Sequence, residues 1–92
     1  MLSALDTTEA RALADALLQP LRAHDASRGT ALVETVRTWL AHDARIDEAA
    51  QALGIHRHTV RARVAQAQQL LGRDLASFPA RAELWAALVA TG

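Results

Sequence analysis

The segment from Asp47 to Leu71 constrains the fold of this chain more than any other part of it. Two runs of helix-favouring residues are separated there by Gly54. Glycine adopts the left-handed conformation that ends a helix at little cost, so the first run predicts a short helix of about seven residues, capped by Asp47. Apolar residues then recur at helical spacing from Val60 onward, and Gly72 is the next stop signal. The segment predicts two helices joined by a tight turn.

The rest of the composition predicts an all-α fold. The chain has 92 residues, of which 22 are alanines, and no stretch alternates apolar and polar residues with a period of two. A chain of this length suits one compact domain with a thin core. We therefore expect a single domain over residues 1–92, built from five helices.

The first two helices are predicted from capping residues and apolar spacing. The first should begin near Asp6, Thr7 or Thr8, and Pro20 should end or kink it near Leu18, because proline lacks an amide hydrogen. The second, capped by Asp25 or Ser27, should end near His42. The apolar positions predicted for these two helices are Leu13, Leu17, Leu18, Leu21, Leu32, Val33, Val36, Trp39 and Leu40.

The last helix should be capped by Ser77 and carry Pro79 in its first turn. It should bury some of its large apolar residues, which are Leu84, Trp85, Leu88 and Val89. The three aromatic residues, Trp39, Phe78 and Trp85, lie on apolar stripes and are expected in the core rather than on a base-stacking surface.

Redox and membrane functions find no support in the sequence. The chain has no cysteine, which excludes disulfides and thiolate zinc ligands. The first twenty residues include three acids and no unbroken apolar run, so neither a signal peptide nor a membrane span is expected. A cytoplasmic protein without a membrane partner is the expectation.

The charge is unevenly distributed although the formal net charge is zero. Residues 49–73 hold four arginines and no acid, whereas residues 1–48 hold eight acids and five arginines. No carboxylate within this basic segment opposes the approach of a polyanion.

The basic segment coincides with the layout of a helix-turn-helix. Ala50 permits close helix approach, Gly54 makes the turn, and Ile55 packs with Leu53 and Val60. The second helix, predicted at about 56–71, turns its apolar stripe inward and leaves the opposite face free to enter the major groove of double-stranded DNA. The residues expected at DNA are His56, Arg57, His58, Thr59, Arg61, Arg63 and Arg45.

At these residues the chain resembles the C-terminal helix-turn-helix domain of PucR-type regulators of purine catabolism and of the related sugar-diacid regulators. The resemblance covers nearly the whole chain. It is carried by five segments, which are LLQPLRAHD (17–25), TALVETVRTWL (30–40), AAQALGIHRHTVRARV (49–64), LLGRDL (70–75) and RAEL (81–84). Three positions differ from the residues usual in the family: His58 replaces asparagine, Ala62 an aromatic residue, and Arg45 asparagine.

The resemblance implies a DNA-binding domain at the end of a longer bacterial transcription regulator, in which other domains bind any effector. It also implies that His56, Arg57, Thr59 and Arg61 lie at the DNA. One short helix contacts few base pairs, so we expect the intact regulator to bind paired half-sites as a homodimer.

Two other classes of function remain as alternatives. The arginine-bearing face of the second helix in the motif could instead dock an acidic protein, which would make the chain a protein-interaction module. A metal or enzyme site is disfavoured, because His56 and His58 point in different directions on a helix and His24-Asp25 has no further ligands arranged around it. We therefore expect no cofactor, no metal and no enzymatic activity.

Overall fold

The computed structural model describes residues 4–92, with side chains from Thr8 onward. This part of the chain is all-helical, which confirms the predicted fold class. Five helices follow one another, and they are α1 (Ala4–Arg28), α2 (Leu32–Ala41), α3 (Ile46–Leu53), α4 (Arg57–Leu71) and α5 (Phe78–Thr91).

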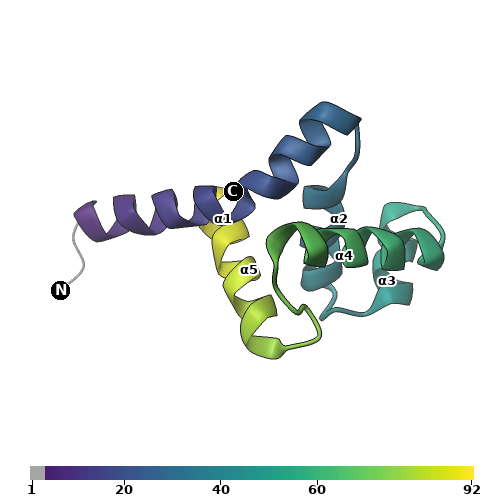
Figure 1. Ribbon diagram of the computed structural model, residues 1–92. Helices are drawn as coiled ribbons and strands as arrows, with labels where there is room; N and C mark the ends of the chain where they lie inside the picture. Colours follow the sequence, from purple (N-terminus) through teal and green to yellow (C-terminus); the bar gives the residue numbers. More distant parts are fainter. Residues whose placement is uncertain (1–3) are drawn as a thin grey trace.

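The helices form two groups around one core. Helices α2, α3 and α4 pack against one another, while α5 packs along α1 and also touches α2. The N-terminal half of α1 extends away from the three-helix group, and α5 lies beside it (Figure 1). The most deeply buried large side chains come from α1, α2, α4, α5 and the loop before α5, and they are Leu18, Leu21, Leu32, Val36, Val60, Leu75, Leu84 and Leu88.

Helix α1 is longer than the sequence predicts. It begins at Ala4, before the expected capping residues, and runs through Pro20 to Arg28. Helix α1 continues past Pro20 and bends part-way along its length (Figure 1), so of the two predicted outcomes, an end or a kink, the helix end is absent. Leu18 and Leu21 on either side of the proline are fully buried. Their packing offsets the loss of a helical hydrogen bond at proline.

Asp25 caps α2 from within α1. Its carboxylate accepts hydrogen bonds from the backbone N–H groups of Leu32 at 2.7 Å and Val33 at 3.1 Å, and from the hydroxyl of Thr30. The prediction that Asp25 or Ser27 caps this helix is thus met by Asp25, because the Ser27 hydroxyl donates to the carbonyl of His24 inside α1. Unpaired amides at a helix start favour such a carboxylate.

The turn between α3 and α4 follows the predicted geometry except at its start. Gly54 adopts φ 69° and ψ 34°, the left-handed conformation that the sequence indicates. The N–H of Ile55 then donates to the carbonyl of Ala50 at 3.1 Å, which closes the end of α3. Asp47 was expected to cap α3 and does not: the helix already begins at Ile46, with Arg45 in the cap position, and Asp47 lies in the first turn.

The aromatic residues divide between core and surface. Trp39 is buried as predicted, whereas Phe78 and Trp85 are 71% and 41% exposed, so their predicted place in the core was wrong. Leu13 also lies outside the core, at 73% exposed. Apolar spacing identifies residues that share a helix face, but it does not tell which of two apolar faces another helix covers.

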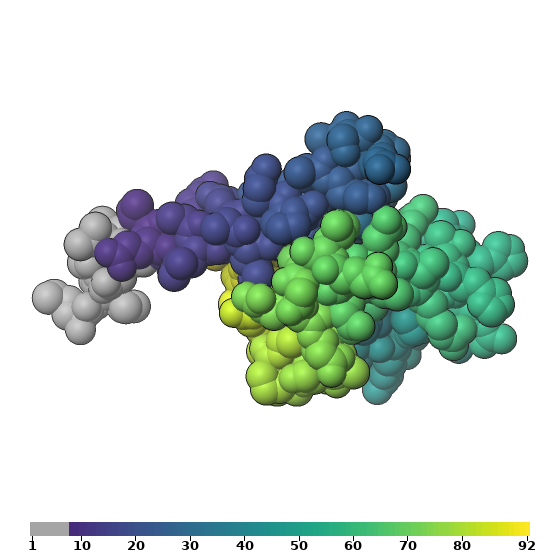
Figure 2. Space-filling model, in the orientation of Figure 1, coloured from purple at the N-terminus to yellow at the C-terminus, as the bar shows by residue number. Residues whose placement is uncertain are grey.

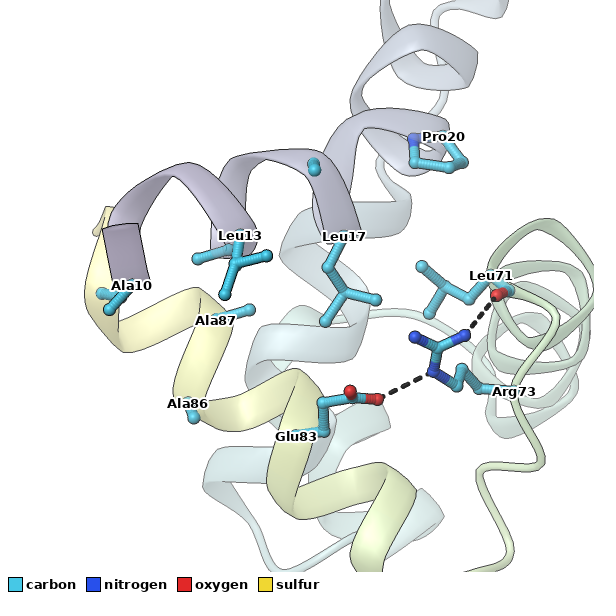
Figure 3. A pocket seen from close by; sticks show the side chains of 12 residues that line it. Ala10, Leu13, Leu17, Pro20, Leu71, Arg73, Glu83, Ala86 and Ala87 are labelled. Carbon is cyan, nitrogen blue, oxygen red and sulfur yellow. Dashed lines mark hydrogen bonds and ion pairs between the residues drawn. The ribbon is translucent and has the colours of Figure 1, made fainter. Parts of the chain in front are cut away.

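An open hollow of about 650 Å³ lies between α1, α5 and the end of α4 (Figure 3). Alanine and leucine side chains make up most of its lining. On one side the Arg73 guanidinium donates to the Glu83 carboxylate at 2.7 Å. This hydrogen bond and the carboxylate charge raise the pKa of Arg73. Arg73 therefore ties the end of α4 to α5.

Candidate nucleic-acid interface

The first half of α4 presents its polar side chains outward. His56 occupies the cap position with extended backbone, φ −70° and ψ 147°, which agrees with its predicted place at the helix start. His56, Arg57, His58 and Arg61 are all exposed, and we call this set the basic face. Val60, on the opposite side of the same turns, is fully buried. The helix is thereby fixed by its apolar side while the basic face stays accessible.

Three members of the basic face have no side-chain partner within the described part of the chain. The side chains of His56, His58 and Arg61 make neither a hydrogen bond nor an ion pair there, and the small side chain of Ala62 is exposed beside His58 and Arg61. An exposed guanidinium without a carboxylate partner retains its full capacity for donating to a phosphate or to a guanine edge. The centre of this surface is therefore cationic, sterically open and unoccupied by the protein's own groups.

Acids from the start of α3 accompany the arginines at the edge of this surface. Arg57 Nη1 lies 3.6 Å from the Asp47 carboxylate, and Arg45 Nη1 lies 3.1 Å from that of Glu48. The hydrogen bond to Glu48 and its negative charge raise the pKa of Arg45. The absence of acids within residues 49–73 therefore does not leave every arginine unopposed, because the fold brings in Asp47 from just outside that segment.

Arg63 and Thr59 lie at the edge of the basic face, where α4 begins to turn toward the other helices. Arg63 is half-buried, and its Nη1 donates to the Thr35 hydroxyl of α2 at 3.2 Å. Thr35 is fully buried and donates in turn to the carbonyl of Ala31 at 2.6 Å. Thr59 is half-buried as well. Of the predicted site residues, these two are the least accessible.

A hydrogen-bonded link between α1 and α4 was not predicted. The His24 ring lies with Nδ1 2.9 Å from the Thr30 hydroxyl and Nε2 3.0 Å from Gln66 Nε2. Since the Thr30 hydroxyl donates to Asp25, it accepts from Nδ1–H, which leaves Nε2 to accept from the Gln66 amide. The second half of α4 is thus tied to α1 (Figure 2 shows the two in contact). Only the tertiary fold reveals this pairing, because its residues are 42 positions apart.

Among the side chains that the structure describes, from Thr8 onward, no group of three or more His, Asp or Glu is placed to hold a metal ion. His56 and His58 are both exposed, and neither has a carboxylate bound to it. None of the described helices is both long and apolar enough to cross a bilayer.

The sequence that forms α3, its glycine turn and α4 matches a known family. A model of the PucR C-terminal helix-turn-helix domain matches residues 32–90, which include all of α2, α3 and α4 and nearly all of α5. The chain belongs to this PucR family. The resemblance stated above is thereby confirmed, and membership implies DNA binding by a transcriptional regulator. Helix-turn-helix domains of regulators are typically not enzymes.

Two curated relatives extend the similarity of this PucR-type domain beyond the family model. The chain is 44% identical over 84 residues to an uncharacterized protein in the pkwA 5′ region of Thermomonospora curvata, covering 91% of this chain and 46% of the relative. It is 39% identical over 82 residues to the transcriptional activator PmfR of Paenarthrobacter nicotinovorans, covering 89% of this chain and 17% of PmfR. The chain spans less than half the length of either relative. No solved structure matches it significantly.

Proposed function

We propose that this PucR-type domain reads duplex DNA by placing the first half of α4 in the major groove. The single observation that carries the proposal is the outward, unpartnered position of His58 and Arg61 on a helix whose other side is locked into the core. An α-helix fits the major groove, where arginine donates to guanine and histidine to acceptor edges. Arg57 and His56 lie at the helix start, where phosphate is also favoured.

The remaining predicted residues have supporting roles in this proposal. Arg45 lies before α3 and is exposed, which suits a phosphate contact beside the groove. Arg63 holds α4 against Thr35 of α2, so its contribution is to fix the angle of the reading helix, with any DNA contact limited to its exposed part. Thr59 is half-buried beside the basic face, so any DNA contact that it makes is likewise limited to its exposed part.

The whole regulator is proposed to act as a homodimer on paired half-sites. A single reading helix contacts too few base pairs for useful specificity, and two-fold symmetry doubles the contacted sequence. The relatives are much longer than this chain, and the domains in their additional length are the proposed binding place of any effector. The name of PmfR, a transcriptional activator, supports a role in controlling transcription.

Duplex binding by Arg61→Ala tests the proposal. DNA would first be selected from a random pool by the unmodified chain, and affinity would then be measured by fluorescence anisotropy over a range of salt. Loss of one base or phosphate contact is expected to weaken binding about 5-fold to 150-fold. Arg11→Ala is the matched control, because Arg11 is exposed on α1, far from α4 in the sequence.

The salt dependence separates this function from the alternative of a protein-interaction module. A DNA-binding domain loses affinity steeply as salt rises, and a phosphate contact removed by mutation reduces that slope by about one. Undiminished binding by Arg61→Ala would refute α4 as the reading helix. Failure to select any duplex would favour an acidic protein as the partner of the basic face.

A further inference from the structure

Helix α5 is apolar on two faces, and only one of them is covered. Leu84, Ala87 and Leu88 point into the core. On the other side Phe78, Ala82, Trp85 and Val89 are all exposed, at spacings of four, three and four residues. This spacing places them in one row along the full length of α5, and we call the row the outer stripe. A helix that is apolar all round is normally covered on both sides.

The outer stripe is separate from the DNA-reading surface. Among the described helices, α5 packs against α1 and α2, and its link to the end of α4 is the ion pair of Arg73 with Glu83, a residue outside the outer stripe. Phe78 and Trp85 also border an open hollow of about 480 Å³. Its other wall is formed at the end of α2 and the following turn by Leu40, Ala41, Asp43 and Ala44. An occupant of this face would leave the basic face free.

The order of side chains in the outer stripe makes it self-complementary. We infer that the stripe binds the same stripe of a second copy of this chain, with the two α5 helices antiparallel about a two-fold axis. An axis midway between Glu83 and Leu84 pairs the largest side chain, Trp85, with the smallest, Ala82, of the second copy. The same register pairs Phe78 with Val89. In such an isologous contact each pair occurs twice, so Trp85 faces Ala82 and Phe78 faces Val89 on both sides of the axis.

The available area predicts a weak dimer. Phe78, Trp85 and Val89 are 71%, 41% and 62% exposed. Side chains of this size offer on the order of 300 Å² per copy in total. Two copies would bury on the order of 600 Å² from the stripe, which is below the roughly 1,200 Å² of stable specific interfaces. The isolated chain should therefore be in monomer–dimer exchange, with the paired state favoured when adjacent DNA half-sites bring two copies together.

Sedimentation equilibrium of this chain without DNA tests the inference. The average mass is expected to rise from monomer toward dimer between about 10 µM and 1 mM, the range of weak interfaces. Ala82→Glu places a carboxylate opposite Trp85 and is expected to weaken dimerisation at least tenfold. Ala12→Glu is the matched control on α1, because Ala12 is also an exposed helical alanine. Circular dichroism of both variants verifies that the helices are retained.

A cysteine pair tests the antiparallel register, and the natural chain has no cysteine to interfere. Phe78→Cys combined with Val89→Cys should form disulfide-linked dimers under mild oxidation. These two positions are about 16 Å apart along one helix, so they cannot bond within a chain. Each single variant should link far less, because the axis places its two copies at opposite ends of the helix pair.

Three results would overturn the inference. They are a monomer at every concentration, an equal dimerisation constant for Ala82→Glu and the unmodified chain, and equal cross-linking by the single and double cysteine variants. Since the mass measurement contains no DNA, failure here leaves the proposed DNA binding standing. Failure of DNA binding likewise leaves the dimer contact intact.

Discussion

Replacing Asp25 by alanine should destabilise the whole domain, although Asp25 lies outside the core. The carboxylate satisfies two amides at the start of α2 and the Thr30 hydroxyl, and it joins the end of α1 to α2. One of the two amides belongs to Leu32, which is fully buried. Without the Asp25 carboxylate, this amide would lose its hydrogen-bond partner at a place that water does not reach. The residue in the cap position of α2, Ala31, makes no side-chain cap hydrogen bond of its own.

The size of the effect follows from these contacts. A helix cap is worth about 1 kcal/mol, and hydrogen bonds to a charged group are worth about 1.5–3 kcal/mol, so we expect Asp25→Ala to lower the free energy of unfolding by about 2 kcal/mol. A domain of this length has a total of roughly 5–14 kcal/mol. The melting temperature should therefore fall by about 8–16 °C.

The stabilisation depends on pH in a direction that the structure sets. Burial opposes ionisation of Asp25, but hydrogen bonds from Thr30, Leu32 and Val33 and the electrostatic interaction with His24 outweigh it, so the pKa is lowered. A carboxyl with a lowered folded pKa stabilises the protein above its unfolded pKa of about 3.9, and this contribution is lost as pH falls through the folded value. The difference between the unmodified chain and Asp25→Ala should be constant above about pH 5 and shrink below about pH 4.

Urea unfolding followed by circular dichroism measures this difference. The control is Asp15→Ala on the same helix, whose exposed ion pair with Arg22 should contribute less than about 0.5 kcal/mol. Equal loss of stability in both variants, or a loss for Asp25→Ala that is unchanged at pH 3, would refute the capping role.

Three further outcomes are expected. Leu18→Ala should cost about 3–5 kcal/mol in urea unfolding, because Leu18 is fully buried; a loss below 1 kcal/mol would contradict the assigned core. Asp47→Asn should tighten duplex binding several-fold at low salt, because it removes a negative charge that lies 3.6 Å from Arg57. Weaker binding by this variant would contradict the expectation and show that Asp47 assists the DNA contact. Arg63→Ala should lower the free energy of unfolding by about 1 kcal/mol through loss of the Thr35 bond, while Arg61→Ala stays within about 0.5 kcal/mol; equal urea midpoints for the two variants would contradict this assignment.

Local signals in the sequence predict much of the fold. Gly54, Gly72 and Ser77 stand at helix ends where the sequence predicts them. The two glycines act through their own left-handed backbone, whereas Ser77 occupies the cap position of α5 without a side-chain cap hydrogen bond. Pro20 is different: its local effect predicts a break, and the burial of Leu18 and Leu21 by other helices keeps α1 continuous. Such packing depends on the assembled core and has no local signature.

The sequence predicts where the candidate site lies on the chain better than it predicts which residues contact its arginines. Helical spacing alone separates the exposed His58 and Arg61 from the buried Val60. The contacts of Arg57 with Asp47 and of Arg63 with Thr35 join different helices, so they depend on interhelical distances that a residue pattern does not supply. The exposure of Phe78 and Trp85 was missed for a similar reason, since the sequence does not show which face of α5 meets α1.

Methylation interference most directly tests the central claim that α4 reads the major groove. Dimethyl sulfate modifies guanine N7 in the major groove and adenine N3 in the minor groove of the selected duplex. Binding by this chain should be blocked by N7 methylation at a few guanines, and Arg61→Ala should lose that sensitivity at one of them. Interference confined to adenine N3, or an identical N7 pattern for the variant, would contradict the placement of α4.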